Sequence, residues 1–201
     1  YSSWGDYVLG EIEYKSRLLS QLPSKSQVGP VKLEKILDIF PGLHRTIGLM
    51  EWSIFEQRSS LLSHGDAHFR NFIVNPDENG AWKINGMIDT DEALGGDPEI
   101  DIAFIENWLH FVPYGQRFQE HKDDFLAGYK DIRGISDHYS SRRLIYHALR
   151  SLSYLQAVSA FDQNIFANEP KNLDNVSKHL GVLKSLAAGN ALEDLRILSL
   201  V

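Results

Sequence analysis

Cysteine is absent from the 201-residue sequence. This absence excludes a disulfide framework, a metal site built on thiolates and a cysteine nucleophile. It is compatible with a reducing compartment, and we therefore expect a cytoplasmic protein. No apolar run approaches the roughly 18 residues that a membrane-spanning helix needs. The first residues also lack the basic and apolar regions of a secretory signal, so we expect no membrane partner.

Basic residues are missing from one stretch of the chain. Residues 84–116 contain seven Asp or Glu residues and no Lys or Arg, whereas the remaining chain holds 20 acids and 20 bases. The formal net charge of −7 therefore comes from this stretch alone. Because no segment is strongly basic, we expect no nucleic-acid partner bound through its phosphates.

Apolar periodicity predicts a mostly helical chain, of the α+β class, with one β-hairpin in its middle. The hairpin strands are expected at residues 72–74 and 81–88, because the intervening residues are dense in turn formers. Asp97-Pro98-Glu99 predicts a helix start, with Asp97 as N-cap and Pro98 at the first helical position. Helices are expected over residues 4–22, 31–40 (ended by Pro41-Gly42), part of 43–60, 97–111, 117–131, 140–160 and 173–188.

The segment of residues 64–71, His-Gly-Asp-Ala-His-Phe-Arg-Asn, carries the strongest chemical signal. It presents Asp66 and, five residues later, Asn71, whose oxygen atoms suit Mg²⁺ or a hydroxyl proton. Asp89 follows the second strand, and an antiparallel hairpin brings the bases of its strands together, so Asn71 and Asp89 should be neighbours. This arrangement suits phosphoryl transfer, with Asp66 deprotonating an acceptor hydroxyl and Asn71 and Asp89 holding Mg²⁺ on nucleotide phosphates.

Three motifs in this order resemble the aminoglycoside phosphotransferase family, a branch of the protein-kinase-like fold. They are His64-Gly-Asp-x4-Asn71, Gly86-Met-Ile-Asp89 and Gly96-Asp-Pro-Glu-Ile-Asp101-Ile-Ala103. The resemblance implies that Asp66 is the catalytic base and that Asn71 and Asp89 are metal ligands. It also implies that Asp97 and Asp101 support the catalytic loop, with His64 as a buried loop anchor. Thr90 stands where the family usually has an aromatic residue, which leaves the local packing open.

The same resemblance exposes a missing part. Such kinases begin with an N-terminal lobe of strands that carries a phosphate-covering loop and a Lys for the nucleotide. Here only about 60 residues precede the catalytic loop, and they are predicted to be helical. We therefore expect residues 1–201 to form a single domain, the C-terminal lobe, without the N-terminal lobe and hinge. The chain alone would then be inactive, and its partners would be the missing lobe, ATP or GTP, and a small-molecule acceptor.

Two other function classes remain open from the residues alone. One is a binding or regulatory module built from a lone kinase C-terminal lobe. The other is a metal-dependent hydrolase, because histidines flank Asp66 at positions typical of a zinc site; its residues would be His64, Asp66, His68 and Asp89. For the kinase, the acidic stretch favours a cationic acceptor of the aminoglycoside type.

Several further residues of the acidic stretch have ordinary interpretations. Glu106 and Asn107 lie on the helix that follows the third motif, where a wall of the substrate site could form; we expect them on a solvated face. Asp91 and Glu92 are interpreted either as a solvated pair or as a contact to metal or substrate. The aromatic residues at near-helical spacing, including Trp108, are expected in the core.

Overall fold

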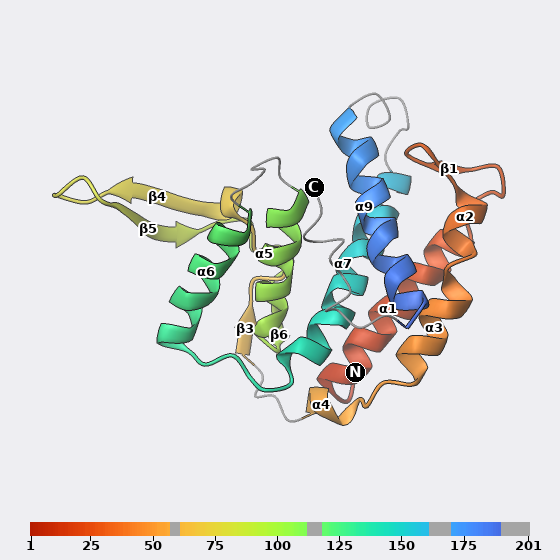
Figure 1. Ribbon diagram of the computed structural model, residues 1–201, viewed down its shortest axis with the longest axis horizontal. Coiled ribbons are helices and arrows are strands. Elements are labelled where there is room, and N and C mark those ends of the chain that lie inside the picture. The colour runs from red at the N-terminus through yellow and green to blue at the C-terminus, as the bar shows by residue number, and fades with distance from the viewer. Residues whose placement is uncertain (57–60, 112–117, 161–169, 190–201) are drawn as a thin grey trace. The chain divides into compact units, whose positions relative to one another are not determined.

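The computed structural model describes residues 1–56, 61–111, 118–160 and 170–189. The chain divides into two compact units, which are described separately (Figure 1). The helical unit comprises residues 1–57 and 137–201, and the loop unit comprises residues 58–136. That residues 1–201 form one kinase-like lobe stays a prediction.

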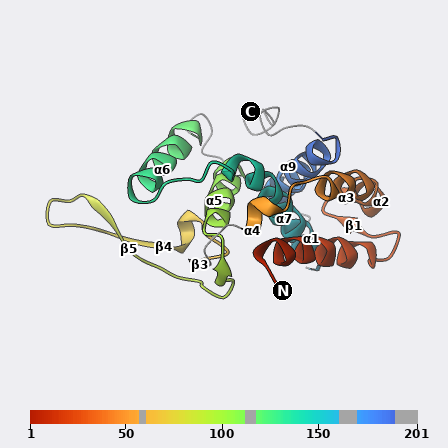
Figure 2. The same cartoon turned by 90° about the horizontal axis from the view of Figure 1, so that it is seen from below.

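The helical unit is built mainly from three packed pairs of helices. Helix α7 packs against α1 and α9, and α9 packs against α3 (Figures 1 and 2). Its elements are α1 (Trp4–Ser20), β1 (Gln27–Val28), β2 (Val31–Lys32), α2 (Leu33–Leu37), α3 (Phe40–Gly48), α4 (Ser53–Glu56), α7 (Tyr139–Ala160) and α9 (Pro170–Ala187). The two short strands pair antiparallel across Gly29 and Pro30.

The core of the helical unit forms where apolar stripes meet. Val8, Ile12 and Leu19 of α1 are fully buried, at the spacing that places them on one helix face. The indole Nε1 of Trp4 donates to the Tyr146 hydroxyl of α7 at 2.9 Å. A Cβ at Gly42 would lie 2.8 Å from the Ala187 carbonyl oxygen, so glycine permits the close approach of α3 and α9.

The loop unit combines two small antiparallel sheets with two helices. Its elements are β3 (Leu61–Ser63), the 3₁₀ helix η1 (Phe69–Asn71), β4 (Phe72–Pro76), β5 (Trp82–Met87), β6 (Leu94–Gly96), α5 (Glu99–Phe111) and α6 (Phe118–Ile132). β3 pairs with β6, and β4 pairs with β5 to form a hairpin. The hairpin register shifts between Ile73 and Val74, which marks a bulge. α5 packs against α6.

The predicted fold class is confirmed: the described chain is mostly helical, with a β-hairpin in its middle. The predicted helix over residues 31–40 is wrong. Residues Val31–Lys32 form a strand, the helix that follows ends at Leu37, and a new helix begins at Phe40. Pro41 lies in the first turn of this helix rather than stopping one, because a proline there gives up no intrahelical hydrogen bond. Residues 57–60 and 117 of the expected helices lie outside the described residues.

None of the described helices is long and apolar enough to cross a membrane.

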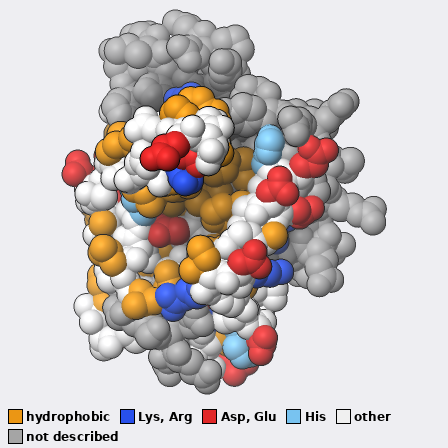
Figure 3. All heavy atoms as spheres, turned by 90° about the vertical axis from the view of Figure 1, so that its left-hand side faces the viewer, with side chains coloured by type: hydrophobic (Ala, Val, Ile, Leu, Met, Phe, Trp, Pro, Cys, Tyr) orange, Lys and Arg blue, Asp and Glu red, His pale blue; other side chains and the backbone are white. Residues whose placement is uncertain are grey.

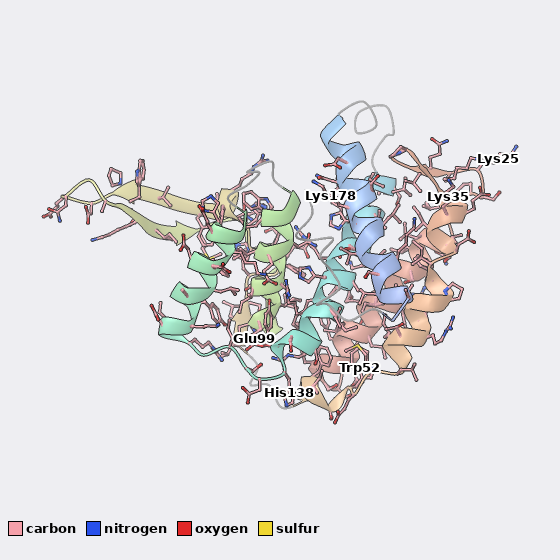
Figure 4. All side chains as sticks on the ribbon, in the orientation of Figure 1. Lys25, Lys35, Trp52, Glu99, His138 and Lys178 are labelled. Atoms are coloured by element: carbon pink, nitrogen blue, oxygen red, sulfur yellow. The ribbon has the colours of Figure 1, made fainter. Side chains whose placement is uncertain are left out.

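Glu99 connects the start of α5 to the segment that follows α6. It lies at the start of α5 (labelled in Figure 4) and its side chain is fully buried. Its carboxylate oxygens accept hydrogen bonds from the Ser136 backbone N–H at 2.7 Å and from the Ser136 hydroxyl at 2.8 Å. The segment that leaves α6 is thereby fixed against the first turn of α5.

We expect Glu99→Ala to lower the free energy of unfolding by about 2 kcal/mol, because hydrogen bonds to a charged, buried partner are lost together. Urea denaturation followed by circular dichroism measures this. Glu78→Ala is the matched control, because Glu78 is exposed in the hairpin turn of the same unit. Equal stability of the two variants would contradict the role assigned to Glu99.

Candidate active site

The segment of residues 64–71 is a loop between β3 and β4 that ends in the 3₁₀ helix η1. Asp66 lies within the loop and is partly buried, whereas Asn71 at its end is buried. The Asn71 side-chain Nδ2 donates to the Asp66 carbonyl oxygen at 3.1 Å. This bond orients the amide, and among the described residues no hydrogen bond uses its Oδ1. The loop therefore places the side-chain oxygen of Asn71 five residues after the carboxylate of Asp66.

Glycine is required at the second position of the loop. Gly65 has a φ of +79°, and a Cβ there would lie 2.1 Å from the carbonyl oxygen of Glu92. Any other residue would meet both the steric cost of left-handed backbone and a collision with this carbonyl. The chain preceding Asp66 is thus packed directly against the segment that follows the hairpin.

Asp101 of α5 holds the same part of the loop. Its Oδ2 accepts from the His64 backbone N–H at 2.8 Å, and its Oδ1 accepts from the Gly65 N–H at 2.9 Å. Burial raises the pKa of this carboxyl above its ordinary value of 3.8, although the two hydrogen bonds oppose the shift. One side chain therefore fixes two consecutive residues immediately before Asp66.

His64 connects the loop to the end of the hairpin. Its ring is buried, and its Nε2 lies 2.9 Å from the Ile88 carbonyl oxygen. Since a carbonyl only accepts, Nε2 carries the proton in this bond. The Ile88 N–H in turn donates to the Asn71 carbonyl oxygen at 2.9 Å. These bonds tie Asn71 and the residue before Asp89 to one another.

Asp89 itself has an unusual backbone. Its φ is +64°, and it is the one non-glycine residue with a positive φ in the described part of the chain. Aspartate is among the few residues that adopt this conformation, because its short side chain can bond locally. The position of the carboxylate after β5 therefore depends on a locally strained residue.

His68 lies beside Asp66 and is supported by aromatic rings. Its Nε2 is 3.5 Å from the Asp66 Oδ2. The imidazole stacks on the Trp108 indole of α5, with ring centroids 5.9 Å apart and 20° between the planes. Phe69 contacts the same indole edge-on at 5.2 Å. Trp108 was expected in the core; it is partly buried and packs against the buried cluster of Ala67, Ile105 and Leu109. Its contact with His68 could have been inferred from its spacing of seven residues from Asp101, which places both on one face of α5.

The remaining site candidate, Asp97, lies two residues before the first residue of helix α5. Its Oδ1 accepts from the Glu99 backbone N–H at 3.1 Å, and the residue is fully buried. This is the geometry of an N-cap, in which a side-chain oxygen satisfies one of the free N–H groups of the first turn. Asp97 thus fixes the start of the helix that carries Asp101.

The structure corrects one expectation about α5. Glu106 and Asn107 were expected on a solvated face, but they are only 3% and 2% exposed. Lys122 of α6 approaches the Glu106 carboxylate, with Nζ 3.9 Å from Oε1. Glu106 is buried because α6 packs against α5 on the side that carries it.

No group of three or more His, Asp or Glu side chains that could hold a metal ion occurs in the described residues. The zinc arrangement considered for a hydrolase, with His64, Asp66, His68 and Asp89, is therefore not assembled as a ligand cluster. His64 instead uses one ring nitrogen to bind a backbone carbonyl.

A comparison with protein-family models matches residues 18–145 to the phosphotransferase enzyme family. The chain belongs to this family. The matched residues include the loop, the hairpin and α5, so the phosphotransferase assignment covers every site candidate described above. A search of curated proteins gave no match.

Solved structures of an aminoglycoside phosphotransferase share the fold. A thermostable mutant of aminoglycoside phosphotransferase APH(4)-Ia in its apo form has a TM-score of 0.53 at 16% identity, over 94% of this chain and 53% of that chain. Another mutant of the same enzyme, in a ternary complex with ADP and hygromycin B, has a TM-score of 0.55 at 17% identity, over 95% and 54%. The chain thus spans about half the length of these structures.

We expect Asp101→Asn to reduce the free energy of unfolding by about 2 kcal/mol, because an amide NH₂ cannot accept one of the two backbone N–H bonds. Urea denaturation measures the loss, and hydrogen exchange at His64 and Gly65 should become faster. Asp131→Asn, the same change at an exposed position of α6, serves as control. Unchanged exchange at both amides would contradict the contacts described for Asp101.

Two carboxyl groups of the loop unit should have pKa values on opposite sides of 3.8, the ordinary value for aspartate. Burial raises the pKa of Asp101. The bond to Lys83, followed by the backbone N–H groups of Ala81 and Asn79, lowers that of Asp77. Carbon NMR of the side-chain carboxyls against pH measures both, and a common midpoint would contradict this expectation.

The shift of Asp101 also sets the sign of a stability change. Because the folded pKa is the higher one, the folded state holds this proton longer than the unfolded chain. The stabilisation that comes from protonation of Asp101 is therefore fully present below 3.8 and is lost as pH rises through the folded pKa. The hydrogen bonds that its oxygens accept from His64 and Gly65 are a separate contribution, which remains at higher pH.

Proposed function

We propose that the full-length protein transfers the γ-phosphoryl group of ATP or GTP to a hydroxyl group of a small, cationic molecule. The observation that carries this proposal is the loop held by Asp101, which presents Asp66 beside the oxygen-bearing side chain of Asn71. Membership of the phosphotransferase family supports it. A cytoplasmic location, where such nucleotides are available, stays a prediction.

Asp66 is the proposed catalytic base. It would accept a hydrogen bond from the acceptor hydroxyl, orient the attacking oxygen and take up its proton. The loop keeps Asp66 in place through the two bonds to Asp101 just before it and the Asn71 bond to its own carbonyl. The contribution of this chain to catalysis is therefore mainly the positioning of a base.

Asn71 and Asp89 are the proposed Mg²⁺ ligands, and the donor set fits this ion. Both side chains offer oxygen atoms, which hard cations prefer. The Asn71 amide nitrogen is already engaged, which directs its oxygen to a ligand. Bound Mg²⁺ would neutralise charge on the nucleotide phosphates. The hydrogen bonds of Ile88 to His64 and to Asn71 fix the residue before Asp89 relative to Asn71 and to the loop.

His64, Asp97 and Asp101 are the proposed supports of the catalytic loop. His64 binds the carbonyl before Asp89, Asp101 binds the two N–H groups before Asp66, and Asp97 caps the helix that carries Asp101. We assign none of the three to contact with substrate.

The proposed acceptor is an amine-bearing molecule of the aminoglycoside type. Within the stretch of residues 84–116, which contains no base, the exposed acids Asp89, Asp91 and Glu92 would attract a cation, whereas Asp97, Glu99 and Glu106 are buried in structural contacts. The structural relative with ADP was solved with hygromycin B, which is consistent with such an acceptor here.

A second lobe is proposed to complete the enzyme, because the chain spans about half of its structural relatives. That lobe would supply the remaining contacts to the nucleotide phosphates, and the 201-residue chain alone would turn over little or no substrate. Measurable turnover by the isolated chain with ATP, Mg²⁺ and an aminoglycoside would contradict this part of the proposal.

We expect Asp66→Asn in the full-length protein to lower kcat by about 100-fold or more, the usual scale for the loss of a general base. The measurement is ADP release with a panel of aminoglycosides and neutral or anionic hydroxyl compounds. Asp131→Asn should retain the kcat of the unchanged protein, since Asp131 is exposed on α6. A kcat that Asp66→Asn leaves unchanged would overturn the assignment, and preference for anionic acceptors would overturn the acceptor class.

A further inference from the structure

The hydrogen bonds that fix the backbone around Asp66, the proposed catalytic base, do not reach its carboxylate. Asp101 binds the two N–H groups that precede Asp66, and the Asn71 side chain binds its carbonyl oxygen. A base must be held in direction as well as in place, because a small misplacement of a reacting group lowers the rate steeply. The orientation of the carboxylate therefore calls for a contact of its own.

His68 is placed to orient this carboxylate. Its backbone is extended, with a φ of −154° and a ψ of 161°, and residues two apart on an extended segment point to the same side. The His68 Nε2 accordingly lies 3.5 Å from the Asp66 Oδ2. This distance is that of an electrostatic contact rather than of a hydrogen bond, and such distances between catalytic groups often shorten once substrates are bound.

The other ring nitrogen of His68 indicates where the proton of the imidazole resides. Its Nδ1 is buried and has no hydrogen-bond partner in the described part of the chain. A proton on Nδ1 would leave a buried donor unpaired and would turn the Nε2 lone pair toward the Asp66 carboxylate. A proton on Nε2 instead gives the carboxylate a donor. We therefore assign the neutral tautomer with its proton on Nε2.

The ring of His68 is held by Trp108 of α5. The two rings stack with 20° between their planes, which fixes the plane of the imidazole and with it the direction of Nε2–H. Trp108 itself packs against the buried cluster of Ala67, Ile105 and Leu109. The support of the imidazole thus comes from the apolar core of the loop unit.

The surroundings of the contact are mainly apolar. Of the two side chains, 17% of His68 and 22% of Asp66 are exposed. Ala67, the residue between them, lines a cavity with mainly apolar walls, and Figure 3 shows hydrophobic side chains gathered in a hollow on one face of the molecule. In such surroundings an N–H group attracts a carboxylate more strongly than it does in water.

We propose that His68 is a positioning residue for phosphotransfer, whose Nε2–H holds the Asp66 carboxylate in the direction of the acceptor hydroxyl. This inference rests on the proposed role of Asp66 as the base. His68 contacts neither nucleotide nor acceptor in this role and acts through Asp66 alone. Its loss should therefore lower kcat and leave KM unchanged, because the binding of both substrates does not involve it.

The kinetic test compares two substitutions of His68 in the full-length protein. His68→Phe keeps a flat ring that can stack on Trp108 but removes the N–H group, and we expect kcat to fall about tenfold with KM unchanged for the nucleotide and the acceptor. His68→Gln keeps an N–H donor at a similar reach and should restore most of the kcat. ADP release under the conditions used for Asp66→Asn measures both parameters.

His44→Phe is the matched control. His44 is exposed on α3 and stacks on Phe40, with ring centroids 6.0 Å apart and 25° between the planes, so the same change is made to a stacked histidine outside the site. It should retain the kcat and KM of the unchanged protein. Thermal unfolding of all three variants shows whether each one is folded at the assay temperature.

The contact itself is tested without any turnover. In the full-length protein labelled with ¹⁵N at histidine, ¹H–¹⁵N spectra in mildly basic buffer report which ring nitrogen carries the proton, and the signal that His68→Phe removes belongs to His68. We expect the proton on Nε2. Asp66→Asn should shift this Nε2 signal and leave that of His44 in place, because only His68 faces the altered side chain.

The proposal is contradicted by a proton on the Nδ1 of His68, or by a kcat that His68→Phe leaves at the level of His44→Phe. It is also contradicted if His68→Gln loses as much kcat as His68→Phe, which would show that the ring matters and the N–H does not. If the unchanged protein phosphorylated no acceptor, the proposed function would fail by itself, whereas the ¹⁵N spectra would still decide whether His68 donates toward Asp66.

Discussion

One carboxylate, that of Asp101, organises the loop unit. By accepting the N–H groups of His64 and Gly65, it fixes the direction in which the chain enters the loop. Gly65 can then lie against the Glu92 carbonyl, and His64 can reach Ile88 at the end of the hairpin. Helix α5, the loop and the segment before Asp89 are thereby linked through consecutive backbone groups. The raised pKa shows that burial of this charge is only partly offset by its hydrogen bonds.

The sequence pattern predicted those elements whose signal is local and repeated. Helices α1 and α7 each carry an apolar stripe over several turns, and the turn formers between residues 75 and 80 indicated the hairpin. The pairing of β3 with β6 was not predicted, because each strand has three residues and about 30 residues separate them. Pro41 was misinterpreted because a proline can precede a helix start as readily as it follows a helix end.

For the site residues, too, local contacts could be predicted from the sequence and distant contacts could not. A capping role for Asp97 could be derived from Asp-Pro-Glu alone, since the contact lies within one turn. The contacts of Asp101 could not, because its partners lie 36 and 37 residues away, and only the family resemblance suggested them. Glu99 with Ser136 and His68 with Trp108 are likewise contacts between distant segments. The burial of Glu106 depends on where α6 packs, which no pattern in α5 indicates.

The left-handed backbone at Asp89 has a consequence for protein engineering. An L-residue in this region costs roughly 1 kcal/mol or more relative to glycine, so the folded chain would be more stable with glycine there. A screen that rewards heat resistance alone would favour removal of the very carboxylate that follows the hairpin. Thermal tolerance and the proposed metal binding thus place opposite demands on this one position, and a selection scheme for this chain has to score both.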